Sequence, residues 1–194
     1  MHSARPVSYF NKNRMILIQK LKVPIKRIVS KKGKHMRPSN QYIGITGIIE
    51  RMTPMREDCC NQLLSLRTMN GMVNFILSTG TYVVDNTPLR TGMRITAFYD
   101  DSQPVPLIYP PRYQAAFIGR TEPSETVTVA YFDRNLLSVE KQLKLNVSSG
   151  TRVTTANGQR FPCEVGNHLL IVYYGASTRS IPAQTTPDRI IVFC

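Results

Sequence analysis

Residues 63–83 read LLSLRTMNGMVNFILSTGTYV, and residues 136–153 read LLSVEKQLKLNVSSGTRV. Both stretches begin with Leu-Leu-Ser and end with the pattern Ser-x-Gly-Thr-x-Val. Five further pairs continue the match in the same order: Gly92 and Gly166, Tyr99 and Tyr174, Ser102 and Ser177, Pro106 and Pro182, Pro111 and Pro187. A collinear match of this kind indicates an internal repeat. We therefore predict one copy at residues 42–120 and a second at residues 125–194.

Each copy has the sequence features of short β-strands. Residues 43–52 and 125–132 are rich in β-branched side chains with partial alternation, which is typical of half-buried strands. The Asn70-Gly71 pair between two apolar runs predicts a β-hairpin, and a tighter turn at Glu140-Lys141 is its counterpart. The remaining predicted strands are 81–84, 92–99 and 113–118 in copy one, and 151–154, 166–174 and 189–193 in copy two.

No stretch of residues 41–194 shows the periodicity of a helix, so we predict an all-β fold. Five or six short antiparallel strands in about 70 residues match the size of a small closed barrel such as the OB-fold. The prediction is a tandem duplication of a small antiparallel β-barrel (OB-like) domain, although residues 78–91 contain no candidate for the helix that OB-folds usually carry.

The positive charge is concentrated at the start of the chain. The sequence has 25 basic and 12 acidic residues, and eleven of the basic residues lie within residues 1–40, which contain no acidic residue. Residues 41–194 therefore hold 14 basic and 12 acidic side chains, which is a weak charge excess for a nucleic-acid-binding body.

The basic leader, residues 1–41, has three interpretations. It is a disordered or targeting segment, a basic arm that binds phosphates, or a stretch that is not translated. In the third case the protein starts at Met36, because the Lys-Lys-Gly-Lys run at residues 31–34 is what a translated purine-rich ribosome-binding sequence would encode.

The four cysteines do not form the framework of a small secreted domain. Cys59 and Cys60 are adjacent, and Cys194 is the last residue. No apolar run approaches the roughly 20 residues of a membrane-spanning helix. We therefore expect reduced thiols and a soluble, cytoplasmic protein with no membrane partner.

Candidate catalytic and metal-binding groups are few. His168 lies within an apolar strand, which favours a structural role, and the chain has no nucleophile elbow, P-loop or dinucleotide-binding fingerprint. Adjacent cysteines in a strand point to opposite faces and cannot share an ion easily, and Asp100-Asp101 resembles a solvated turn. We expect no catalytic residue, no metal and no cofactor, although an enzyme with a spatially assembled site stays an alternative.

The most distinctive segment is the proline-rich stretch that follows residue 99. It places large apolar groups on a loop, and such a patch either folds back to plug the barrel, which we consider the better supported arrangement, or is an exposed partner site. The predicted binding residues are Tyr99, Pro104, Pro106, Leu107, Ile108, Tyr109, Pro110, Pro111, Arg112 and Tyr113.

The strand end Phe98-Tyr99-Asp100 and the run PVPLIYPPRYQA, residues 104–115, resemble small uncharacterised β-rich proteins of clostridia and related Gram-positive bacteria. The resemblance implies a bacterial source and no activity.

Three functions follow as hypotheses. The first is a non-enzymatic interaction module that presents its loops to an unknown protein partner. The second is single-stranded nucleic-acid binding by aromatic platforms, for which Tyr99, Tyr113, Tyr131, Phe132, Tyr173 and Tyr174 are candidates with Arg94, Arg112 and Arg189. The third is an enzyme with an assembled site. The sequence does not specify the oligomeric state.

Overall fold

The computed structural model describes residues 41–56 and 58–194, so the predictions for the basic leader and a start at Met36 lie outside the described residues. The strand content is 52%, and the described residues contain no α-helix. One 3-10 turn, η1 (Val84–Asn86), interrupts the strands. The prediction of an all-β fold is confirmed.

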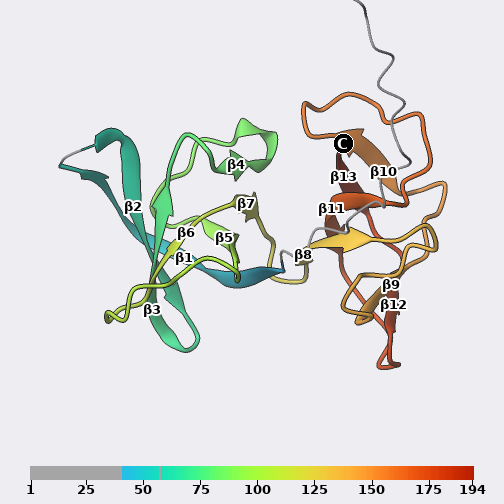
Figure 1. The fold of residues 1–194 in the computed structure, drawn as a ribbon, viewed down its shortest axis with the longest axis horizontal. Helices are drawn as coiled ribbons and strands as arrows, with labels where there is room; N and C mark the ends of the chain where they lie inside the picture. Colours follow the sequence, from blue (N-terminus) through green and yellow to red (C-terminus); the bar gives the residue numbers. More distant parts are fainter. Residues whose placement is uncertain (1–40, 57) are drawn as a thin grey trace, which may run out of the picture. The chain divides into compact units, whose positions relative to one another are not determined.

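The first half, residues 42–120, forms one sheet of seven strands. Its order is β4-β7-β5-β1-β2-β3-β6. The chain passes from β6, at one end of this order, to β7, next to the other end, across only two residues, so the sheet curves strongly (Figure 1). The strands are β1 (Tyr42–Met55), β2 (Asp58–Thr68), β3 (Gly71–Leu77), β4 (Tyr82–Val83), β5 (Arg94–Asp100), β6 (Arg112–Gln114) and β7 (Phe117–Arg120).

The second half, residues 125–194, has a four-stranded sheet of order β10-β13-β11-β8 and a two-stranded sheet of β12 and β9. The central strands β11 and β13 are almost wholly apolar, which agrees with their burial on both faces. The strands are β8 (Thr126–Phe132), β9 (Leu143–Leu145), β10 (Arg152–Thr155), β11 (His168–Tyr174), β12 (Ala183–Thr185) and β13 (Arg189–Phe193).

The finer prediction, a tandem duplication of a small antiparallel OB-like barrel, is wrong. The structure is classed as a β-solenoid of about three turns. Four of the strand pairs are parallel, namely β3 with β6, β4 with β7, β9 with β12, and β10 with β13. The alternation of apolar and polar residues is the same in parallel and antiparallel strands, so the sequence pattern could not reveal these pairings.

The two predicted hairpins had different outcomes. The first is confirmed, because β2 and β3 pair up to Thr68 and Gly71, and Gly71 has a φ of 113°. The second is wrong in its first strand, because Leu137 and Ser138 make only isolated bridges. There the Asp133 carboxylate accepts hydrogen bonds from backbone N–H groups of Asn135 and Leu137, which competes with a regular ladder.

The Ser-x-Gly-Thr stretches form the same local turn. In the first, the Gly80 N–H donates to Ser78 Oγ at 3.3 Å, and the Thr81 hydroxyl donates to a backbone oxygen 34 residues later. In the second, Gly150 N–H donates to Ser148 Oγ, and the Thr151 hydroxyl again donates to a distant backbone oxygen. The repeated sequence therefore encodes a recurrent turn.

A shared apolar core joins the two halves. Val84, Phe98 and Phe117 of the first half pack with residues of β8, β11 and β13. The Tyr82 hydroxyl donates to Ala156 O at 2.7 Å, and the Arg189 guanidinium donates to both carboxylate oxygens of Asp85. These polar contacts fix the relative position of the elements that surround the core.

Candidate functional site

The loop of residues 101–111 connects β5 to β6 and is drawn in yellow-green beside β3 in Figure 1. Nearly all of it is exposed to solvent. The arrangement that we considered better supported, in which the loop folds back as a plug, is therefore wrong. The end of the loop is held at β3, because β6 pairs with β3 and the Pro111 carbonyl accepts a hydrogen bond from Asn74 N–H at 2.9 Å.

Four large apolar side chains of this loop form what we call the apolar ridge. Leu107 is 104% exposed and Tyr109 89%, and Ile108 and Val105 are 46% and 39% exposed. Monomeric proteins rarely leave contiguous apolar groups in water without a functional reason. Leu107, Ile108 and Tyr109 of the ridge were predicted binding residues, and Val105 was not.

The loop is held in shape by short-range contacts. Asp100 Oδ1 accepts hydrogen bonds from the N–H and the hydroxyl of Ser102, at 2.9 and 2.6 Å. These hydrogen bonds hold the pKa of the Asp100 carboxyl below its usual value. Ile108 N–H donates to Pro106 O at 2.9 Å, which closes a three-residue turn. Prolines at 104, 106, 110 and 111 restrict the backbone further.

An aromatic stack anchors both ends of the loop. The rings of Tyr99 on β5 and Tyr113 on β6 are stacked with centroids 4.0 Å apart and an interplanar angle of 18°. Phe75 on β3 packs below them, 5.7 Å from Tyr113. Burial raises the pKa of Tyr99, and the adjacent Tyr113 raises it further. The strands on either side of the loop are therefore joined through side chains as well as backbone.

A small cavity lies between the loop and the sheet, and we call it the loop cavity. Its volume is about 220 Å³. It is lined by Ile76, Tyr99, Asp100, Gln103, Pro104, Val105, Pro106, Arg112, Tyr113 and Gln114. Arg112 is partly buried, and its Nε atom is shielded from solvent without a hydrogen-bond partner. The lining is mostly apolar and also carries one cationic group, Arg112, and one anionic group, Asp100. A few polar groups in an apolar cavity are typical of a binding site.

The structure brings most of the predicted residues together in this region. Tyr99, Pro104, Pro106, Arg112 and Tyr113 line the loop cavity, and Leu107, Ile108 and Tyr109 belong to the apolar ridge. Pro110 lines a separate hollow of about 480 Å³ beside β2 and β3.

Sequence reasoning missed five residues that line the loop cavity: Ile76, Asp100, Gln103, Val105 and Gln114. Ile76 and Gln114 face each other only because β3 and β6 pair in parallel. Asp100 and Gln103 were adjacent to predicted residues, so their position at the start of the loop was a signal that could have identified them.

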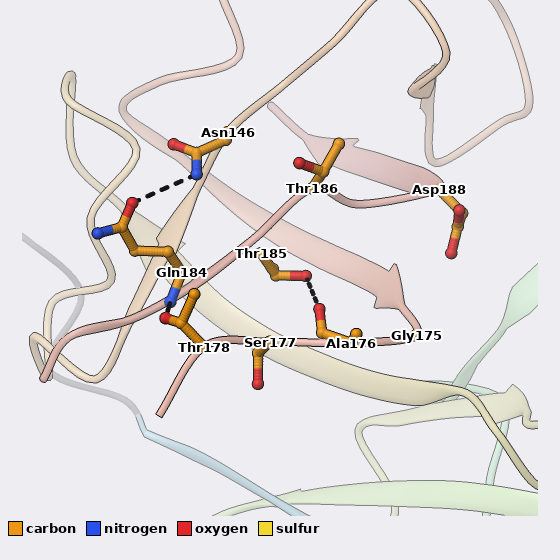
Figure 2. Close-up of a pocket in the computed structure, with 9 residues that line it drawn as sticks. All are labelled: Asn146, Gly175, Ala176, Ser177, Thr178, Gln184, Thr185, Thr186 and Asp188. Carbon is orange, nitrogen blue, oxygen red and sulfur yellow. Dashed lines mark hydrogen bonds between the residues drawn. The ribbon is translucent and has the colours of Figure 1, made fainter. Parts of the chain in front are cut away.

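The corresponding loop of the second half is different in chemistry. A hollow of about 570 Å³ is lined by residues 175–178, 184–186, Asn146 and Asp188, and Figure 2 shows these side chains. Several of its polar groups bond to each other: Thr185 Oγ1 donates to Ala176 O at 2.6 Å, and Gln184 N–H donates to Thr178 Oγ1 at 2.8 Å. These contacts brace the loop and leave fewer groups for a ligand.

His168 occupies a structural position. The His168 ring packs edge-on against Phe161, with centroids 5.4 Å apart, and its Nδ1 lies 3.2 Å from Val165 O. Within residues 41–56 and 58–194, no group of three or more His, Cys, Asp or Glu residues is placed to hold a metal ion. All four cysteines are free and exposed. In the part of the chain that the structure describes, no helix is long and apolar enough to cross a membrane.

A scan against protein-family models and a search of curated proteins found no match to this chain.

Proposed function

We propose that the protein is a non-enzymatic interaction module that binds a protein partner through the loop of residues 101–111. The observation that carries the proposal is the apolar ridge, in which Leu107 and Tyr109 are almost completely exposed. Burying such side chains against a partner is favourable by about 1.5–3 kcal/mol for each fully buried group.

The rigidity of the loop supports the same function. Binding through a flexible segment costs conformational entropy, and a segment that is already held in its bound shape avoids most of this cost. Here the Ser102–Asp100 hydrogen bonds, the prolines and the Tyr99–Tyr113 stack hold the ridge before any partner arrives.

The side chains that a single-stranded nucleic acid would need are less available. Tyr173 is 5% exposed and Phe132 is fully buried, and the rings of Tyr99 and Tyr113 stack on each other. Arg189 is paired with Asp85. These contacts favour a protein partner over stacked bases, which need free aromatic faces.

A site-specific photo-crosslinker tests the proposal. A benzophenone amino acid replaces Leu107 in the full chain, and in the matched control it replaces Ile181, which is 96% exposed on the loop of the second half. After illumination in the cells that make the protein, we expect the chain with the crosslinker at position 107 to form discrete protein adducts. The chain with the crosslinker at position 181 should not form the same adducts. Unmodified chain added in excess should compete for the adducts, and a Leu107→Ser, Tyr109→Ser chain should not.

Three outcomes would overturn the proposal. They are identical adducts from both positions, the absence of a protein adduct at position 107, and adducts to nucleic acid in place of protein. In the last case, binding of a single-stranded oligonucleotide that weakens steeply with salt would identify the second hypothesis as the function.

A further inference from the structure

The loop cavity opens beside the apolar ridge and contains a cation that no described residue neutralises. We propose that this cavity binds the carboxyl-terminal residue of the protein partner. A large apolar side chain of that residue would occupy the cavity, and its terminal carboxylate would pair with the Arg112 guanidinium. This inference rests on the proposed function, because it names the part of the partner that the loop recognises.

The size and lining of the cavity suit one large apolar side chain. Its volume is about 220 Å³, whereas an apolar cavity of about 150 Å³ is enough to hold benzene. Tyr99, Val105 and Tyr113 contribute apolar surface, as do Ile76, Pro104 and Pro106. A Leu, Ile or Phe side chain would therefore fill the space without displacing the loop.

Arg112 supplies the charge complementarity. Its Nε atom is buried and has no hydrogen-bond partner, and its side chain forms no ion pair with the described residues. Because Nε is shielded, the carboxylate would accept two parallel hydrogen bonds from the two terminal Nη atoms of the guanidinium. The Asp100 carboxylate also lines the cavity, and its Oδ1 accepts hydrogen bonds from Ser102 N–H and Oγ.

A terminal residue fits this arrangement better than an internal acidic residue. Successive side chains of an extended peptide point to opposite sides, and the next side chain on the same side is about 6–7 Å along the chain. In a carboxyl-terminal residue, the side chain and the carboxylate leave the same Cα. This geometry places both groups within a single cavity of about 220 Å³.

Peptide binding to the full chain tests the inference. Fluorescence anisotropy compares three labelled hexapeptides: one that ends in Gly-Gly-Leu with a free carboxylate, the same peptide with a terminal amide, and an amidated peptide that ends in Gly-Leu-Asp. We expect the free acid to bind, and both amidated peptides to bind at least about tenfold more weakly, because charge-assisted hydrogen bonds are lost. A free acid that ends in Gly should also bind weakly.

Arg112 variants connect the binding to this cavity. Arg112→Met should weaken binding of the free acid at least about tenfold and remove the difference between acid and amide, and Arg112→Lys should recover only part of it, since Lys cannot form the two parallel bonds. The matched control, Arg179→Met, changes an exposed arginine of the other loop and should leave binding unchanged. Thermal melting of each variant verifies that it is folded.

The inference is overturned if acid and amide bind equally, if the Asp-containing peptide binds best, if the free acid does not bind at millimolar concentration, or if folded Arg112→Met binds normally. The proposed function survives each of these results as long as Leu107 still yields its specific crosslinks. The absence of specific protein crosslinks from position 107 would overturn the proposed function, whatever the peptides show.

Discussion

A methyl group added at Gly119 is the sharpest test of the core that the two halves share. Gly119 lies on β7, and a Cβ built there would be 2.3 Å from Tyr173 Oη and 3.3 Å from Tyr173 Cζ, on β11. Carbon atoms in contact are normally about 3.5–4.0 Å apart. Tyr173 is only 5% exposed and packs among the residues of the shared core, so it has little room to move away.

We therefore expect Gly119→Ala to lower the free energy of unfolding by about 1–3 kcal/mol, the usual cost of overpacking a filled core. Tyr173→Phe removes Oη, and the nearest remaining contacts of the new methyl group are then at 3.3 Å and at 3.8 Å, to Val84. The double variant Gly119→Ala, Tyr173→Phe should recover most of the loss, with a coupling energy of about 1–2 kcal/mol.

Urea unfolding is followed by far-UV circular dichroism for four proteins: the wild type, Gly119→Ala, Tyr173→Phe and the double variant. Gly80→Ala is the matched control, because its added Cβ would meet only Ser78 Oγ, at an ordinary 3.7 Å. The control should unfold within about 0.5 kcal/mol of the wild type. The reasoning is refuted if Gly119→Ala is as stable as Gly80→Ala, or if removing the Tyr173 hydroxyl recovers nothing.

Three further predictions concern charges and the loop. Hydrogen bonding to Arg189 lowers the pKa of Asp85, so the favourable contribution of this pair is present above the ordinary value of 3.8 and is lost as the pH falls through the lowered pKa. Because Asp85 is 55% exposed, Asp85→Asn should cost less than about 1 kcal/mol at pH 7 in urea unfolding, and that difference should vanish in acid; a difference that persists at pH 2 would contradict this. Arg112→Met should raise the free energy of unfolding by about 1 kcal/mol, because it removes a buried donor without a partner, and a lower thermal midpoint would count against this interpretation. The double variant Leu107→Ser, Tyr109→Ser should keep the wild-type urea midpoint to within about 0.5 kcal/mol, because both side chains are exposed, and a larger loss would show that the ridge serves folding.

Local patterns predicted most strands of the protein. The alternating β-branched residues of 43–52 lie within β1, and the apolar run 189–193 coincides with β13. The Asn70-Gly71 signal succeeded because a glycine with positive φ begins β3. These features depend on neighbouring residues, and the sequence states them directly.

Local patterns failed where side chains compete with the backbone ladder. Ser138 Oγ accepts hydrogen bonds from the N–H groups of Gln142 and Leu143, and Leu136 has a φ of 59°. The first strand expected for the second hairpin, before the Glu140-Lys141 turn, is consequently replaced by a series of turns. Strand β12 was not predicted, because its three residues pair only with β9, about 40 residues earlier in the chain.

The sequence by itself determined the all-β class, the recurrent Ser-x-Gly-Thr turn and the apolar composition of the loop that carries the ridge. Only the tertiary structure decided that the strands pair in parallel at four places, that Ile76 and Gln114 meet below the loop, and that Leu107 and Tyr109 are exposed. The physical reason is the sequence separation of the residues that interact. Turn geometry and strand propensity depend on neighbours in the chain, whereas pairing, burial and cavity shape depend on which distant segments pack together.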